Sequence, residues 1–219
     1  MSQSVHEAFR RSAERTPEAD FLFTESVTAG VYGIAAGAVS WKAAGAEVER
    51  LSQAYRAAGY GHGHRVGLLL ENRPVFLYHW FALNAVGASV VPINAEMRSA
   101  ELVYLIGHSE LCLVVTLAHR ADDLAAAARE AGRTVAVVGP DADVLPAATT
   151  PPPRAGEPPG PDSECALLYT SGTTGRPKGC LLDNDYFLRS GQWYATLGGL
   201  CEVRPDRERI MTPLPLNHV

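Results

Sequence analysis

Residues 65–93 decide the fold, and they read RVGLLLENRPVFLYHWFALNAVGASVVPI. Two short apolar runs in this stretch, Arg65–Leu70 and Ser89–Ile93, have the length of buried β-strands. The segment between them, Pro74–Val86, has the length of a helix. A strand, a helix and a second strand favour parallel pairing, because a parallel connection needs about a dozen residues. The stretch therefore predicts one strand–helix–strand unit of an α/β sheet.

The same alternation continues along the chain. Further apolar runs at Leu111–Thr116 and Thr134–Gly139 follow helical segments at Ser99–His108 and Ala121–Ala131. The repeated order of helix and strand predicts an α/β fold with largely parallel sheet layers and flanking helices.

Two helices are predicted upstream of this alternation. Ser4 and Glu7 fit a capping box that opens the first helix, whose apolar residues fall on one face. Ser40 can cap the second helix, which carries apolar residues at steps of three and four and stops at Gly59. These helices are expected to pack on the sheet.

A proline-rich segment separates this part of the chain from the next one. Eight of the fifteen prolines lie between Pro140 and Pro161, so this segment is expected to be an extended, irregular connection. Beyond it, Cys165–Tyr169 and Gly179–Leu182 are predicted strands around a loop, and a helix is expected at 183–197. The predicted organisation is a first α/β region at 1–139, the connection at 140–161 and a loop-bearing region at 162–219.

Composition excludes several classes of protein. The net charge of −5 argues against a nucleic-acid partner, and the lack of a long uninterrupted apolar run argues against a membrane span. The N-terminal stretch lacks an apolar signal core. Four scattered cysteines suit reduced thiols better than disulfides or a zinc site, so a cytoplasmic location is expected.

The loop between the last two predicted strands carries the chemistry. It reads Tyr169-Thr-Ser-Gly-Thr-Thr-Gly-Arg-Pro-Lys-Gly179. Glycines let backbone N–H groups approach phosphate oxygens, hydroxyls add donors, and Lys178 adds a compact positive charge. In a Walker loop the lysine follows a glycine and precedes Ser or Thr, whereas Lys178 follows Pro177 and precedes Gly179. The loop therefore favours polyphosphate binding outside the P-loop class; its structural alternative is a polar surface turn.

This loop resembles, nearly letter for letter, the phosphate-loop signature of the adenylate-forming superfamily, which includes acyl-CoA synthetases and peptide-synthetase adenylation domains. Residues 65–74, 81–87 and 91–94 are also similar to the region before the loop in acyl-CoA ligases, and Ser99–Leu102 and His108–Glu110 continue the likeness. The end of the chain, Pro213–Val219, is similar to the next family motif, with Asn217 as a departure. The resemblance implies an incomplete N-terminal domain of an adenylate-forming enzyme.

The resemblance also implies a reaction and its site. The full-length protein is expected to be an AMP-forming acid–thiol ligase, in which a carboxylic acid becomes an acyl-adenylate and then a coenzyme A thioester. ATP and coenzyme A are the expected co-substrates, and the ligand of the Mg²⁺ ion is expected downstream of this chain. Lys178 and His218 are the expected catalytic residues, the second beside the substrate carboxylate. The expected ATP-binding residues are Thr170, Ser171, Gly172, Thr173, Thr174, Gly175 and Lys178.

Two other functions remain open from the sequence. One is an adenylation domain that loads a carrier protein, and the other is a truncated, non-catalytic nucleotide-binding protein. This fragment alone is expected to be inactive, because the family's downstream residues are not in it. Its expected partners are a small carboxylic acid and the C-terminal remainder of the enzyme or a complementing chain, and a homo-oligomer is left open.

Several residues outside the loop have structural interpretations. His62 and His64 fit a glycine-rich turn better than a metal pair, because no third ligand is evident. His79 fits a packed core position. The adjacent acids Asp122 and Asp123 fit a helix N-terminus.

Overall fold

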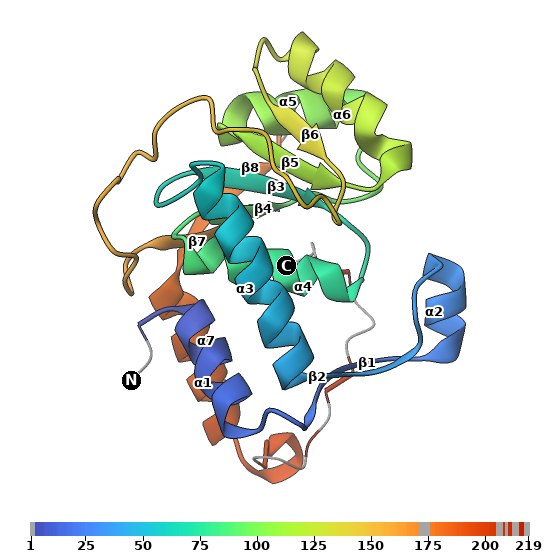
Figure 1. The fold of residues 1–219 in the computed structure, drawn as a ribbon, viewed down its shortest axis with the longest axis vertical. Helices are drawn as coiled ribbons and strands as arrows, with labels where there is room; N and C mark the ends of the chain where they lie inside the picture. Colours follow the sequence, from blue (N-terminus) through green and yellow to red (C-terminus); the bar gives the residue numbers. More distant parts are fainter. Residues whose placement is uncertain (1–2, 171–175, 205–207, 209, 212–214, 217–219) are drawn as a thin grey trace.

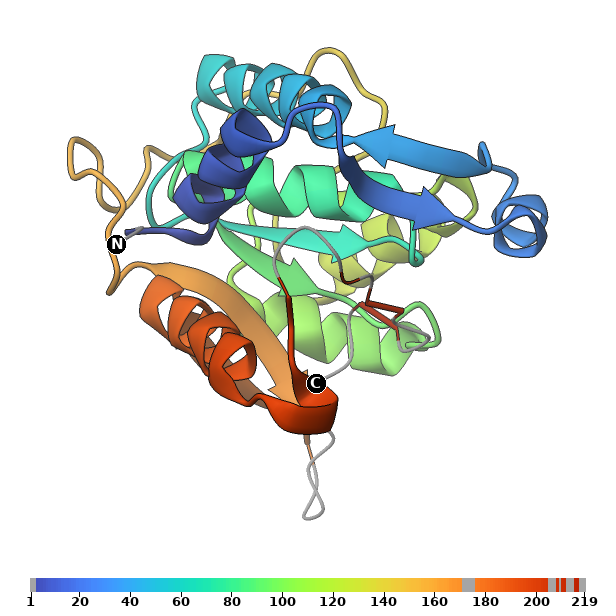
Figure 2. The ribbon, with the colours of Figure 1, turned by 90° about the horizontal axis from the view of Figure 1, so that it is seen from below.

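The computed structural model describes residues 3–170, 176–204, 208, 210–211 and 215–216. The N-terminal part begins with helix α1 (Val5–Arg15), strand β1 (Asp20–Thr24), helix α2 (Ser26–Tyr32) and strand β2 (Gly37–Ser40). Strands β1 and β2 pair antiparallel in a two-stranded sheet, which projects from the body with α2 at its tip (Figures 1 and 2). Helix α3 (Trp41–Ala57) follows directly from β2.

A six-stranded sheet forms the centre of the fold, in the order β6-β5-β3-β4-β7-β8. Its strands are β3 (Arg65–Leu69), β4 (Ser89–Pro92), β5 (Leu113–Thr116), β6 (Ala136–Val138), β7 (Glu164–Thr170) and β8 (Lys178–Asp183). The pairs from β6 through to β7 are parallel, and β8 alone is antiparallel to its neighbour. The sheet is therefore largely parallel, as the alternating sequence pattern predicts.

Helices cover both faces of this sheet (Figure 1). One face packs against α1, α3 and α4 (Pro74–Ala85), and the other packs against α5 (Ser99–Ser109) and α6 (Ala118–Glu130). Helix α7 (Asn184–Thr196) follows β8, and a short 3-10 turn (Gly199–Cys201) comes after it.

Successive side chains of a strand pack against opposite helical layers. In β4 and its extension, Val90 belongs to the core on the α3–α4 face, whereas Val91 and Ile93 belong to the core on the α5–α6 face. In β5, Val115 and Val114 divide in the same way. Successive strand residues point to opposite faces, so a continuous apolar run is what a sheet buried on both sides requires.

Both predicted N-cap serines are confirmed, but Glu7 does not complete the capping box at Ser4, because its carboxylate accepts a hydrogen bond from the backbone N–H of Gln3, at 2.6 Å. The Ser4 side chain accepts a hydrogen bond from the backbone N–H of Glu7, and the Ser40 side chain accepts one from Ala43. Gly59, which follows α3, has φ of +86°, a backbone conformation that glycine adopts readily. The predicted starts of α1 and α3 are confirmed.

The proline-rich connection contains no helix or strand and runs along the amino ends of the parallel strands. It is tied there by backbone hydrogen bonds from Ala148 to Ala58 (2.7 Å) and from Arg154 to His62 (3.0 Å). Leu145 is buried in the core below it. The division of the chain at 140 and 161 stays a prediction.

The structure differs from the sequence pattern in two places. The ribbon of β1 and β2 and helix α2 were not predicted, since α2 contains glycine and β-branched residues that give no helical signal. Helix α6 begins at Ala118 rather than Ala121, so Asp122 and Asp123 lie beyond its first turn. Their assignment to a helix N-terminus is wrong; Asp123 pairs instead with Arg120, at 3.1 Å.

Candidate active site

The candidate site lies where β7 ends, at the carboxyl edge of the parallel strands. Strands β3 and β5 are neighbours, yet the connection after β3 runs to one side of the sheet through α4, on one face, and the connection after β5 runs to the other side through α6, on the opposite face. Ligands of open α/β sheets bind at the carboxyl ends of strands where the connections diverge in this way. Strand β7 pairs with β4 in parallel, so its carboxyl end lies at the same edge.

Strands β7 and β8 form the hairpin that carries the phosphate-type loop. Thr170 and Lys178 are the last residues paired across it. The predicted ligands Ser171, Gly172, Thr173, Thr174 and Gly175 lie outside the described residues. The structure thus places the two ends of the loop, and these ends bring together two of the predicted site residues.

The described ends of the loop present polar and cationic groups to solvent. The side chains of Thr170, Arg176 and Lys178 are all exposed, and the Thr170 hydroxyl is 3.5 Å from the backbone carbonyl oxygen of Lys178. Arg176 and Lys178 are two residues apart, so two positive charges lie at one end of the loop. Such a pair suits the oxygens of a polyphosphate.

Helix α5 contacts both ends of this loop. The Tyr104 hydroxyl donates a hydrogen bond to the carbonyl oxygen of Pro177, at 2.9 Å, and the Arg176 guanidinium lies 5.4 Å from the centre of the Tyr104 ring. One helical turn later, Nδ1 of His108 and the Tyr169 hydroxyl share a 2.7 Å hydrogen bond. Burial raises the pKa of Tyr169 to about 12, so its hydroxyl keeps its proton at neutral pH.

A groove of about 620 Å³ lies between the first part of α5 and the residues that follow the loop, Arg176 and Pro177. This volume is in the range of ligand pockets. Glu101, Tyr104 and Arg176 contribute its polar groups. Arg176 and Pro177 therefore border open space next to the positive charges of Arg176 and Lys178.

Gly179 lets the hairpin close next to the loop. It pairs with Tyr169 across the hairpin, and a Cβ atom at this position would lie 2.8 Å from Cδ1 of Leu167 and 3.4 Å from Cζ of Tyr169. A larger residue would have to displace these side chains. The glycine after Lys178 therefore has a packing reason as well as its place in the motif.

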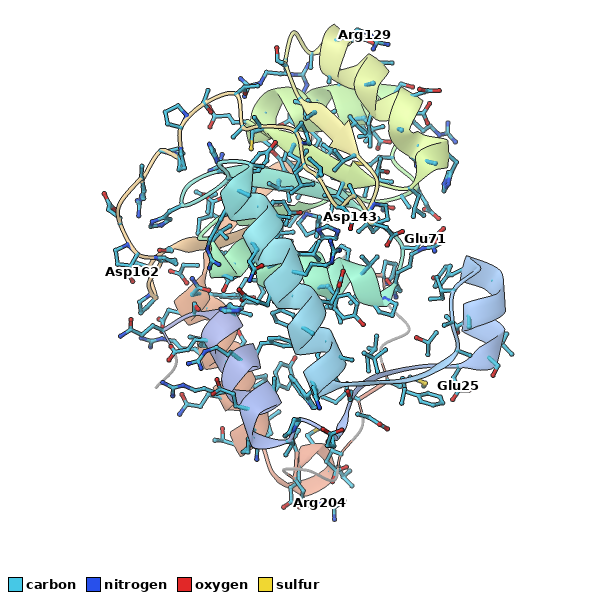
Figure 3. All side chains as sticks on the ribbon, in the orientation of Figure 1. Glu25, Glu71, Arg129, Asp143, Asp162 and Arg204 are labelled. Carbon is cyan, nitrogen blue, oxygen red and sulfur yellow. The ribbon has the colours of Figure 1, made fainter. Side chains whose placement is uncertain are left out.

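The last part of the chain returns to the same edge of the sheet. The side-chain oxygen of Asn72 accepts a hydrogen bond from the backbone N–H of Leu216, at 2.8 Å. Asn72 lies between Glu71, labelled in Figure 3 after β3, and Arg73, whose guanidinium lies over the Tyr32 ring. The predicted catalytic residue His218 lies outside the described residues.

The other candidate histidines have structural partners. Nδ1 of His62 is 3.1 Å from the carbonyl oxygen of Glu157, and Nδ1 of His64 accepts a hydrogen bond from the backbone of Gly61. His79 is buried and bonded on both ring nitrogens. In the part of the chain that the structure describes, no group of three or more acidic, histidine or cysteine side chains could hold a metal ion.

The contribution of α5 to the site could not be predicted from the sequence. Tyr104 and His108 are four residues apart, a spacing that puts two rings on one face of a helix. That spacing was the available signal, but nothing in the sequence indicates what the face contacts.

Among the described residues, no helix is long and apolar enough to cross a membrane.

Comparisons with known proteins identify the family of the chain. The family described as AMP-binding enzyme matches residues 9–219. The chain is 35% identical over 190 residues to a sulfoacetate–CoA ligase of Cupriavidus necator, across 83% of this chain and 36% of that protein. It is 32% identical over 214 residues to a crotonobetaine/carnitine–CoA ligase of Salmonella arizonae, across 89% of this chain and 40% of that protein.

Two solved structures extend the comparison. The inhibitor-bound N-terminal domain of FACL13 from Mycobacterium tuberculosis is similar with a TM-score of 0.78 and 27% identity, covering 99% of this chain and 52% of that one. ATP-bound MatB from Rhodopseudomonas palustris is similar with a TM-score of 0.58 and 31% identity, covering 73% and 32%. The chain spans well under half the length of the two curated relatives, 36% and 40%. With nearly all of its residues matched by one family, the chain belongs to the AMP-binding enzymes.

Proposed function

We propose that this chain carries the ATP-phosphate site of an acid–CoA ligase, which activates a carboxylic acid as an acyl-adenylate and transfers it to coenzyme A. The observation that supports this most is the hairpin of β7 and β8, which presents Thr170 and Lys178 at the carboxyl edge of the sheet. The names of the relatives, which are CoA ligases, support coenzyme A as the acceptor.

The proposed reaction has two steps. A carboxylate oxygen of the acid attacks the α-phosphorus of ATP, and pyrophosphate leaves. The sulfur of the thiol then attacks the acyl carbonyl carbon, AMP leaves, and the thiol proton is released. Both partners of the first step are anionic, so positioning and charge neutralisation supply most of the rate.

The residues of the loop have separate parts in the first step. The Nζ of Lys178 neutralises charge that builds on the departing pyrophosphate, and Arg176 adds a second positive charge. Ser171, Thr173 and Thr174 donate hydroxyl hydrogens, and Gly172 and Gly175 let backbone N–H groups approach the phosphate oxygens. ATP supplies the electrophilic phosphorus, and a Mg²⁺ ion bound with it would neutralise further phosphate charge.

His218 is proposed to act beside the carboxylate of the acid. The contact that supports this is the hydrogen bond from Leu216 to Asn72, which holds the chain at the sheet edge two residues before His218. In the full-length enzyme, His218→Ala is expected to weaken acid activation and to leave ATP affinity nearly unchanged. Equal activity with every acid tested would remove His218 from the mechanism.

Pyrophosphate release by the natural full-length protein tests the proposal, with a panel of carboxylic acids and ATP. Lys178→Ala is expected to slow release on the order of 100-fold or more, as the loss of one preorganised donor does. Lys42→Ala is the matched control, because the chain has just these two lysines and Lys42 lies 3.5 Å from Glu18 on the surface. Pyrophosphate release unaffected by Lys178→Ala would refute the site.

The acceptor is identified by supplying coenzyme A or a phosphopantetheinyl carrier protein after the adenylate has formed. Thioester formation with coenzyme A supports the proposal. Transfer only to the carrier would assign the protein to the carrier-loading enzymes, and ATP binding without pyrophosphate release would make it a non-catalytic nucleotide-binding protein.

A further inference from the structure

One face of helix α5 holds the two ends of the phosphate loop. Tyr104 bonds to the carbonyl of Pro177, the residue before Lys178. His108 bonds to the hydroxyl of Tyr169, the residue before Thr170. The two rings on α5 are stacked on each other, with centres 5.4 Å apart. Each end of the loop is thus tied to the same face of the same helix.

We propose that Tyr104 and His108 form a clamp that sets the position of Lys178 relative to Thr170, so that both are positioning residues for adenylate formation. The clamp rests on the proposed function in one respect, which is that Lys178 contacts phosphate. The contacts themselves lie entirely within this chain.

The position of the hairpin explains why a clamp is needed. Among the residues that the structure describes, strand β8 is the last strand of the sheet and pairs with β7 alone, and its residues are partly or fully exposed. The end of such a pair, with few buried contacts, opens easily. Thr170 and Lys178 are the last pair before the loop, so without contacts from outside the hairpin their separation would vary.

Tyr104 holds two groups of the loop at once. Its hydroxyl bonds to the backbone at Pro177, and its ring carries the Arg176 guanidinium at 5.4 Å. The ring therefore keeps a second positive charge next to Lys178. Tyr104→Phe removes the hydrogen bond and keeps the ring, whereas Tyr104→Leu removes both, so the two contributions can be separated.

Hydrogen exchange of the 219-residue chain without nucleotide tests the clamp directly. We expect amides 178–180 to exchange roughly 3- to 10-fold faster in Tyr104→Phe, which is the effect of losing one hydrogen bond, and faster still in Tyr104→Leu. Tyr194→Leu, at an exposed position near the end of α7, is the control and should leave these amides unchanged. Unchanged exchange in Tyr104→Leu would overturn the clamp.

Kinetics of the natural full-length protein test its consequence. We expect kcat for adenylate formation to fall roughly 3- to 10-fold in Tyr104→Phe while the KM of the carboxylic acid is unchanged, because the phosphate end alone is displaced. His108→Phe keeps a ring and loses the hydrogen bond to Tyr169. It should likewise lower kcat and leave the KM of the carboxylic acid unchanged. If Lys178→Ala had no effect, the proposed function would fail while hydrogen exchange still measured the clamp. If Lys178→Ala removed activity and Tyr104→Leu did not lower kcat, the clamp would fail alone.

Discussion

The Tyr55 hydroxyl donates a hydrogen bond to Nδ1 of His79, 2.7 Å away, in the core between α3 and α4. The other ring nitrogen, Nε2, lies 2.9 Å from the carbonyl oxygen of Pro140 and must carry the proton, since a carbonyl only accepts. The imidazole is therefore neutral and bonded on both sides. Burial lowers the pKa of His79 to about 4, against the smaller opposing effects of the Pro140 carbonyl and Glu47.

The first prediction is a loss of stability in mild acid. The folded pKa of His79 lies below the unfolded value of about 6.5, so the unfolded chain takes up a proton first as the pH falls. The contribution of neutral His79 to the free energy of unfolding is complete above pH 6.5 and is lost as the pH falls toward 4. Between pH 7 and pH 5 the free energy of unfolding should fall by about 2 kcal/mol from this group. Burial also lowers the pKa of His6 and His64, which adds to the loss in the same direction.

Denaturant unfolding at the two pH values measures this loss. His79→Gln should be less stable at pH 7 and should lose less stability than the unchanged protein on going to pH 5. An equal loss in both proteins would show that His79 does not titrate in this way.

The second prediction concerns the junction of three segments at Asn184. This buried side chain accepts hydrogen bonds from the Val5 backbone (3.0 Å) and from Nδ2 of Asn84 (2.9 Å), and it donates to the carbonyl of Gly160 (3.0 Å). Asn184→Ala leaves these groups without that partner, so it should lower the free energy of unfolding by about 2–4 kcal/mol. Denaturant unfolding beside the exposed variant Gln192→Ala checks it, and similar values for both would contradict it.

The third prediction compares two glycines. A Cβ at Gly67, in the central strand β3, would lie 2.9 Å from Cδ1 of Ile93 and 3.1 Å from Cγ2 of Val114. Gly67→Ala should destabilise the protein by about 1–3 kcal/mol because the core cannot take the extra volume. At Gly191, on the exposed side of α7, a Cβ meets no atom within 4 Å. Gly191→Ala should stabilise by about 0.5–1 kcal/mol. Thermal unfolding of the pair gives the two signs, and the same sign for both would be contrary to the structure.

Much of the sheet could be predicted because its central strands β3, β4 and β5 are buried on both faces. The apolar runs that include Val66, Val90 and Val114 are therefore uninterrupted, and each is flanked by turn residues or a helix. The ribbon of β1 and β2 could not be predicted in the same way. Both of its strands remain partly exposed, so no run of buried residues marks them.

The candidate site could be predicted from the sequence where the signal is local, and could not where it depends on tertiary contact. The loop from Thr170 to Lys178 is one continuous stretch, so its residue types could be interpreted together. The contact between Asn72 and Leu216 joins residues 144 apart in the sequence. The contact of Tyr104 with Pro177 spans 73 residues, and it exists because β7 and β8 join the sheet beside β4.

The most direct test of the central claim is labelling of the 219-residue chain with an acyl-phosphate derivative of ATP, followed by mass spectrometry. A lysine amine near the terminal phosphate attacks the acyl carbonyl of this reagent, ATP leaves, and the lysine is acylated. With Lys42 and Lys178 as its two lysines, the chain contains its own control. Acylation of Lys178 that excess ATP suppresses, with Lys42 unaffected by ATP, is the predicted result. Acylation of both lysines to the same extent, insensitive to ATP, would contradict the assignment of this loop to the phosphates of ATP.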